Sequence, residues 1–250
     1  MLLSNVFDQS ARRQSGGKRQ FSLCFALCVW TVYPTFIKIS RKIGHAIVKT
    51  EERMIALEER IQADGKILPG NVVAIDNFLN HQIDIALCRQ MADEIYEAFK
   101  DKPISKILTI EASGIAMATL VARRFNAPLL FAKKTKSTNL HHDIYETNVA
   151  SYTHGDSNRV FVSKKYLPSS DVVLIIDDFL AMGEATRGLI NICEQAGATL
   201  AGIGVAVEKG FQPGGAYLRE QGYPLKSLAI IDAIDEASGK ITFRKEEEKA

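Results

Sequence analysis

The sequence predicts an α/β domain in which a central parallel sheet is flanked by helices. Strand and helix patterns alternate from residue 54 onward, which is typical of a parallel sheet with crossover helices. The segment Val172–Ile176 is an uninterrupted apolar run, and such runs occur in central strands that are covered on both faces. Together, these two observations favour a single layered domain.

The individual elements follow from the spacing of apolar residues. A helix is expected where apolar residues recur every fourth position, from Ile83 to Phe99, and a second where Ile115 to Phe125 show a similar stripe. A third helix is expected over 185–196, and Gly197 is placed to end it. The expected strands are 106–110, 128–132, 159–163, 172–176, 201–207 and 225–231.

Residues 1–53 differ in composition from the rest of the chain. Basic residues precede an apolar run at Phe21–Ile37, and more basic residues follow it. This order resembles a secretory signal, but no small-residue cleavage site follows and Pro34 interrupts the run. The run has 17 residues, which is the short limit for a membrane span, and it includes polar residues.

We therefore favour Met54 as the initiator, with residues 1–53 as a disordered or upstream-translated N-terminal extension. A membrane-associated segment and a folded addition are the alternatives. The expected domain then covers 54–250. Its length allows one domain with a sizeable core.

Charge and cysteine content exclude some functional classes. The formal net charge is +2, too small to indicate a nucleic-acid partner by itself. The four cysteines show no paired spacing of a zinc or redox motif and no disulfide framework. A reducing, cytoplasmic location is therefore expected.

The segment 172–186 (VVLIIDDFLAMGEAT) carries the clearest chemical pattern. A buried strand is followed by Asp177 and Asp178, then by small residues around Gly183, then by a helix. Ligands of open α/β sheets bind outside the carboxyl ends of the strands, and a helix start offers free backbone N–H groups to a phosphate. Carboxylates suit sugar hydroxyls. An acidic pair alone would more often only end a strand, but the whole pattern favours a ligand site.

This segment closely resembles the phosphoribosyl pyrophosphate signature of type I phosphoribosyltransferases. The resemblance implies the type I fold, with a small hood over the base site. It also implies that Asp177 and Asp178 hold the ribose hydroxyls. The residues implied to surround the 5-phosphate are Ala181, Met182, Gly183, Glu184 and Ala185.

A wider resemblance to the bacterial xanthine phosphoribosyltransferase family runs from Met54 to about Phe243. It is carried by 73–84 (VAIDNFLNHQID), 109–115 (TIEASGI) and 202–214 (GIGVAVEKGFQPG). The resemblance implies base binding by Val73, Asn80 and Lys209, and it implies that Ser113 and Gly114 face the pyrophosphate. Phe211 is a candidate for stacking on the purine, although core packing is almost as probable by residue type.

A polar segment over 133–158 is expected to form a mobile loop that closes over the reaction centre. It begins with Lys133, Lys134 and Lys136, which either neutralise pyrophosphate or are simply solvated. The pair His141-His142 is expected to decorate this loop and not to bind a metal. Closure would exclude water from an oxocarbenium-like sugar.

The implied reaction joins xanthine to the ribose 5-phosphate of phosphoribosyl pyrophosphate, with Mg²⁺ bound largely through substrate oxygens and water. No protein metal ligand and no catalytic base is assigned, because Ala181 stands where hypoxanthine–guanine enzymes have an acidic residue. A homodimer without nucleic-acid or membrane partners is implied. The alternatives are an enzyme for another purine and a purine repressor that senses phosphoribosyl pyrophosphate.

Overall fold

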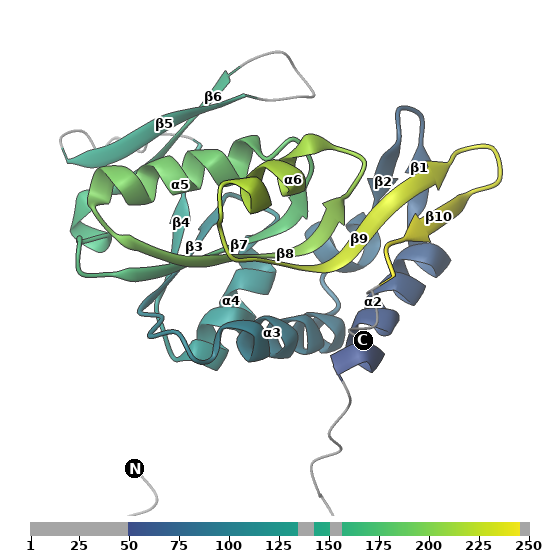
Figure 1. Cartoon of the computed structure of the whole chain (residues 1–250), viewed down its shortest axis with the longest axis horizontal. Coiled ribbons are helices and arrows are strands. Elements are labelled where there is room, and N and C mark those ends of the chain that lie inside the picture. Colours follow the sequence, from purple (N-terminus) through teal and green to yellow (C-terminus); the bar gives the residue numbers. More distant parts are fainter. Residues whose placement is uncertain (1–49, 135–142, 151–156, 246–250) are drawn as a thin grey trace, which may run out of the picture. The chain divides into compact units, whose positions relative to one another are not determined.

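The computed structural model describes residues 50–134, 143–150 and 157–245 (Figure 1). The expectations for residues 1–49, for Lys136 and for the His141-His142 pair lie outside these ranges. Within them, no helix is both long enough and apolar enough to cross a membrane.

The core of the fold is a six-stranded sheet in the order β10-β9-β8-β7-β3-β4. Five strands are parallel, as predicted, but the edge strand β10 pairs antiparallel with β9, so the sheet is mixed. A tight hairpin makes this reversal possible, and its Gly239 adopts a φ of 69°. The strands are β3 (Lys106–Ile110), β4 (Leu129–Ala132), β7 (Val172–Leu180), β8 (Thr199–Lys209), β9 (Leu225–Asp235) and β10 (Lys240–Phe243).

Helices cover both faces of this sheet (Figure 1). On β7, Leu174 and Ile176 enter one hydrophobic core, and Val173 and Ile175 enter the other. This alternation follows from the strand period of two, and it confirms the prediction of a central strand buried on both faces. The first core contains residues of α2 (Thr50–Asp64), α3 (Ile85–Phe99) and α4 (Ile115–Phe125), and the second contains residues of α5 (Glu184–Ala196) and α6 (Pro213–Glu220).

The ends of the helices follow local sequence. Asp84 caps α3, because its carboxylate accepts a hydrogen bond from the backbone N–H of Leu87 at 3.1 Å, so Ile83 precedes the helix. Gly197 ends α5 with a φ of 67°, as predicted. Helix α6 was not predicted. It begins Pro213-Gly214-Gly215, and two glycines in a first turn have low helix propensity.

A small subdomain precedes α3 and corresponds to the expected hood. It consists of α2, the hairpin of β1 (Lys66–Leu68) and β2 (Val72–Ala74), and a π-helical turn η1 (Asp76–Asn80). The hairpin tip contacts the β9–β10 hairpin, where the backbone N–H of Asn71 donates to Glu236 at 2.7 Å. Helix α2 begins at Thr50, and the domain boundary proposed at Met54 stays a prediction.

The prediction of a loop over 133–158 is wrong for part of this segment, which forms strands. Strands β5 (Ile144–Ala150) and β6 (Ser157–Ser163) pair antiparallel in a separate ribbon that packs on α5 (Figure 1). Val149 of β5 is buried against Gly188, where a β-carbon would lie 2.6 Å from the valine methyl. Apolar residues on alternate positions therefore stabilise a ribbon in a segment whose composition is polar.

Candidate functional site

Strand β7 carries the acidic pair within its length. We predicted that the strand ends before Asp177, but it continues to Leu180 because β8 extends alongside it. Asp177 and Asp178 are 4% and 6% exposed. Asp177 accepts a hydrogen bond from the backbone N–H of Asp178 at 3.0 Å, and Asp178 accepts one from the Asn80 side-chain amide at 3.3 Å. Two carboxylates are thus buried side by side.

Burial raises the pKa of Asp177 well above its ordinary value, and the neighbouring charge of Asp178 raises it further. Lys134 opposes this shift only weakly. A carboxyl group in this environment is destabilising for the free protein, and such groups concentrate at functional sites.

The three residues after Leu180 form a compact loop, and Glu184 and Ala185 begin α5. Gly183 adopts a φ of 82°, and its carbonyl accepts the backbone N–H of Arg187 at 2.9 Å in the first turn. The loop therefore presents the N-terminus of a 13-residue helix, with its free N–H groups and positive dipole end. A hollow of about 330 Å³ is lined by all five residues, Ala181, Met182, Gly183, Glu184 and Ala185. We call it the first hollow.

Lys209 lies at the same edge of the sheet, since Leu180 pairs with Glu208 immediately before it. It lines the first hollow, and its ammonium group donates to the backbone carbonyl of Asn71 at 3.1 Å. Partial burial lowers its pKa from the ordinary lysine value. Phe211, a candidate for base stacking or for the core, is 41% exposed and so belongs to neither core.

Of the other two predicted base-binding residues, which both lie in the hood, Asn80 reaches this edge and the Val73 side chain does not. Asn80 reaches the site through its contact with Asp178. Val73 is 5% exposed and packs in the first core, and it pairs with Ile67 across the β1–β2 hairpin. Its side chain is therefore occupied, and its neighbour Val72 lines the first hollow instead.

A second hollow adjoins the first, because Phe179 and Ala185 line both. It has a volume of about 250 Å³, and the predicted residue Ser113 lines it. The other polar residues around it are Glu111, Lys134, Asp177 and Asp178.

Glycine is required where the β3–α4 turn approaches the acidic pair. A β-carbon on Gly114 would lie 2.4 Å from the hydroxyl of Thr109 and 3.1 Å from a carboxylate oxygen of Asp177. The turn itself is braced by Glu111, whose carboxylate accepts the backbone N–H of Lys134 at 2.9 Å. Ser113 and Gly114 therefore lie next to the acidic pair.

Most of the predicted residues thus line two adjoining hollows. Asn80 and Gly114 lie next to the acidic pair, and Val73 is set back in the hood. The structure also adds residues that we did not single out. Glu111 and Gln212 line the hollows, and Gly214 supports the loop through its N–H, which donates to Ala181 at 3.1 Å. All three lie within motifs that the sequence marked, but their roles depend on tertiary contacts.

A comparison against known families agrees with this fold. Residues 74–236 match the phosphoribosyl transferase domain, and the chain belongs to that family. Within it, the chain is 55% identical to xanthine phosphoribosyltransferase of Bifidobacterium adolescentis over 192 residues, which is 76% of this chain and 100% of that protein. The protein of the same name from Ruminiclostridium cellulolyticum is 52% identical over 190 residues, 76% of this chain and 99% of the relative.

Solved structures support the same fold. Adenine phosphoribosyltransferase from Giardia lamblia, in complex with 9-deazaadenine, aligns with a TM-score of 0.57 and 23% identity over 70% of this chain and 96% of its own. The enzyme from Rhodothermus marinus aligns with a TM-score of 0.58 and 20% identity, over 72% and 98% respectively. At these identities the likeness concerns the fold alone.

Proposed function

We propose that the chain transfers ribose 5-phosphate from phosphoribosyl pyrophosphate to xanthine in purine salvage, giving xanthosine 5′-monophosphate and pyrophosphate. One observation carries the proposal: the acidic pair, the phosphate-binding loop and Lys209 share one sheet edge around adjoining hollows. The choice of xanthine is supported by relatives of that name, which are 52–55% identical across nearly their whole length.

In this proposal the first hollow binds the 5-phosphate through the backbone N–H groups of the loop Ala181–Ala185. The helix dipole of α5 adds a partial positive charge of roughly half a unit at this point. Asp177 and Asp178 then accept hydrogen bonds from the two ribose hydroxyls. These bonds favour the charged carboxylates, so substrate binding would oppose the raised pKa of Asp177.

The second hollow is proposed to bind the pyrophosphate, with donors from Ser113, Gly114 and Lys134. Mg²⁺ would offset the charge of the leaving pyrophosphate. The carboxylates of Glu111, Asp177 and Asp178 around this hollow are hard oxygen donors of the kind that Mg²⁺ prefers. In the described part of the chain, no group of three or more potential ligands is close enough to hold a metal by itself.

Base recognition is assigned to Lys209, Asn80 and the backbone of Val73. The Lys209 ammonium suits an exocyclic oxygen of xanthine, and the Asn80 amide has both donor and acceptor atoms for a polar purine edge. In the free protein these two groups bond to Asn71 and Asp178, and they would exchange those partners for the base. A pocket built for the 2-oxygen of xanthine leaves a buried group unpaired when guanine presents an amino group.

The reaction is a displacement at the anomeric carbon of the ribose. A ring nitrogen of xanthine forms the new bond, the bond from that carbon to pyrophosphate breaks, and the ring proton leaves to solvent. Binding in adjoining hollows aligns the two reactants, and this positioning supplies much of the rate. Val149 and Val160 of the β5–β6 ribbon line the second hollow and help to exclude water from the reacting sugar.

We further propose that the enzyme is a cytoplasmic homodimer with no nucleic-acid or membrane partner. The hood exposes large apolar side chains that a second copy would cover. They are Ile55 (49% exposed), Leu68 (45%) and Val72 (42%).

The proposed activity is tested by measuring kcat/KM for xanthine, guanine, hypoxanthine and adenine with Mg²⁺ and phosphoribosyl pyrophosphate. We expect xanthine to be preferred over guanine by at least roughly a hundredfold, because the mismatch leaves a buried polar group unpaired. A guanine or adenine preference would overturn the substrate assignment. Absence of pyrophosphate release with every base would overturn the enzyme assignment.

A further inference from the structure

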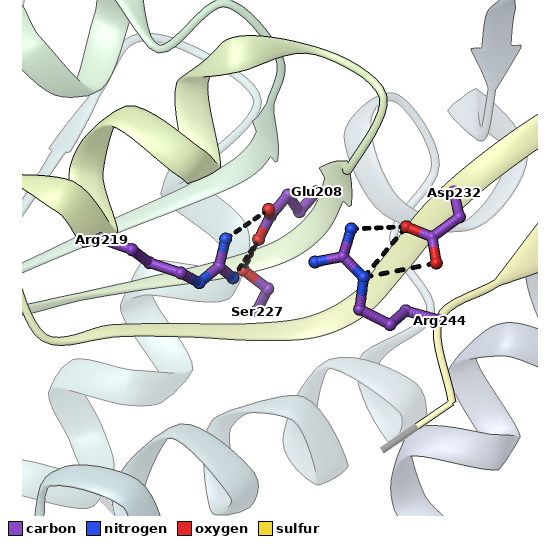
Figure 2. A network of polar contacts seen from close by, with 5 residues as sticks. All are labelled: Glu208, Arg219, Ser227, Asp232 and Arg244. Atoms are coloured by element: carbon purple, nitrogen blue, oxygen red, sulfur yellow. Dashed lines mark hydrogen bonds and ion pairs between the residues drawn. The ribbon is translucent and has the colours of Figure 1, made fainter. Parts of the chain in front are cut away.

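Figure 2 shows an ionic cluster around the buried carboxylate of Glu208. Glu208 is the residue before Lys209 on β8, and it is only 2% exposed. The guanidinium of Arg219 on α6 donates one hydrogen bond to each of its carboxylate oxygens, both at 2.7 Å. Ser227 on β9 donates a third bond to the same carboxylate. The cluster thus joins β8, α6 and β9.

The start of α6 is held between this cluster and the phosphate-binding loop. A β-carbon on Gly215 would lie 2.0 Å from a carboxylate oxygen of Glu208. On the preceding residue, Gly214, it would lie 2.4 Å from the carbonyl oxygen of Ala181. Consecutive glycines therefore allow the helix backbone to contact the carboxylate on one side and the loop on the other.

Arg244 and Asp232 form a second arginine–carboxylate pair (Figure 2). This pair lies beside Gly210, near the start of the segment 209–215 that runs from Lys209 into α6. Arg244 donates to Asp232 at 2.6 Å, and a β-carbon on Gly210 would lie 2.7 Å from atoms of both side chains. The segment 209–215 therefore approaches one ion pair at Gly210, next to Lys209, and the other at Gly215.

We propose that Glu208 and Arg219 form a positioning pair that holds Lys209 and the phosphate-binding loop at a fixed separation. The proposal rests on the function proposed above and adds residues that touch neither substrate. Because segment 209–215 has Lys209 at one end and the loop support Gly214 near the other, a change in the pair displaces both subsites together. This joint effect distinguishes the pair from residues that serve one subsite.

An ion pair suits this task better than an apolar contact. The bidentate geometry of arginine with a carboxylate fixes orientation as well as distance. Burial by itself raises the pKa of Glu208, but the bonds from Arg219 and Ser227 outweigh it, so the pKa lies below the ordinary glutamate value. Glu208 therefore stays ionised at neutral pH, and the cluster keeps its geometry.

The test compares Arg219→Met and Glu208→Gln with the wild-type enzyme. We expect the KM values for phosphoribosyl pyrophosphate and for xanthine to rise together by roughly tenfold or more, because small displacements in a binding site are costly. Arg219→Lys should still raise both KM values, though by less than Arg219→Met, because lysine lacks the bidentate fork of arginine. The control is Arg124→Met, which removes the ion pair of Arg124 with Asp93 between α3 and α4. The two arginines have similar exposure, 41% for Arg124 and 39% for Arg219, but Asp93 is more exposed than Glu208. The control should leave both KM values unchanged.

A lower melting temperature with unchanged KM values would show a purely structural role and overturn the proposal. So would a rise in only one of the two KM values. If Arg219→Met and Glu208→Gln do not fold, the milder Ser227→Ala decides in the same way, with a smaller joint rise expected. Calorimetric titration with phosphoribosyl pyrophosphate and Mg²⁺, without any purine, separates the positioning role of the pair from the proposed use of xanthine as the acceptor. Weaker binding in Arg219→Met supports the pair even if xanthine proves not to be the acceptor.

Discussion

The side-chain amide of Asn80 lies 3.3 Å from a carboxylate oxygen of Asp178 and donates a hydrogen bond to it. The two residues are 98 positions apart in sequence, one in the hood and one on β7. Asn80 is a proposed base-binding residue, and Asp178 is a proposed ribose-binding residue. Their contact therefore joins the hood to the strand edge at the point where base and sugar are proposed to meet.

Replacement of this amide should weaken xanthine binding in particular. We predict that Asn80→Ala raises KM for xanthine by roughly tenfold or more, the effect of losing a hydrogen bond of about 1.5 kcal/mol to a polar ligand. The matched control is Asn77→Ala in the same turn, whose side chain bonds instead to the backbone of Asp64. Equal effects of the two changes on KM for xanthine would remove Asn80 from the base site.

The acidic pair should be essential for turnover and not for folding. We predict that the double variant Asp177→Asn, Asp178→Asn loses detectable pyrophosphate release, because each amide lacks the negative charge and has one acceptor oxygen in place of two for the ribose hydroxyls. Circular dichroism should show an unchanged fold. Full activity in this variant would refute the assignment of both residues.

Asp177→Asn alone should make the free protein more stable near neutral pH. The folded-state pKa of Asp177 is raised, so the folded protein favours the protonated form and loses stability as pH rises through that value. Removal of the buried charge abolishes this loss. We expect a higher melting temperature than wild type at pH 7 and a smaller difference at acidic pH. A lower melting temperature for the variant at pH 7 would contradict this prediction.

The pH profile of kcat/KM should fall on both sides of neutrality. On the acidic side, protonation of Asp177 removes an acceptor for the ribose, and the raised pKa places this limb above the ordinary aspartate range. On the alkaline side, Lys209 loses its proton below the ordinary lysine pKa, because burial lowers it. Lys209→Met should abolish the alkaline limb, and persistence of that limb would assign it to another group.

The close approach of α6 to the phosphate-binding loop predicts a strong effect of one methyl group. Gly214→Ala would place a β-carbon 2.4 Å from the carbonyl of Ala181, so the loop must shift. We expect a marked rise in KM for phosphoribosyl pyrophosphate. Gly239→Ala is the control, because nothing lies within 4 Å of the added β-carbon, although the φ of Gly239 is positive. It should lower stability slightly and leave KM unchanged.

Much of the fold was predictable because apolar periodicity is a local property. The run Val172–Ile176 predicted the central strand, and the stripe that ends at Phe99 predicted α3. The end of β7 was predicted too early, since Asp177 and Asp178 look like a strand end. Their backbone continues as a strand only because β8 extends beside it, and that pairing is not visible in local sequence.

The supporting contacts of the site were not predictable for a similar reason. Glu208 is a single charge at the end of an apolar strand, and its partner Arg219 follows 11 residues later on a helix that the sequence did not predict. Helix α6 forms because Gly214 and Gly215 fit between the loop and Glu208, and this tertiary packing outweighs their low helix propensity.

The central claim is that one sheet edge binds phosphate, ribose and purine in adjoining hollows. A crystal structure of the protein with bound xanthosine 5′-monophosphate tests it most directly. We predict the 5′-phosphate on the N–H groups of Ala181–Ala185, the ribose hydroxyls on Asp177 and Asp178, and the base beside Lys209 and Asn80. A nucleotide bound with its ribose away from the two carboxylates, or with its base remote from Lys209, would contradict the claim.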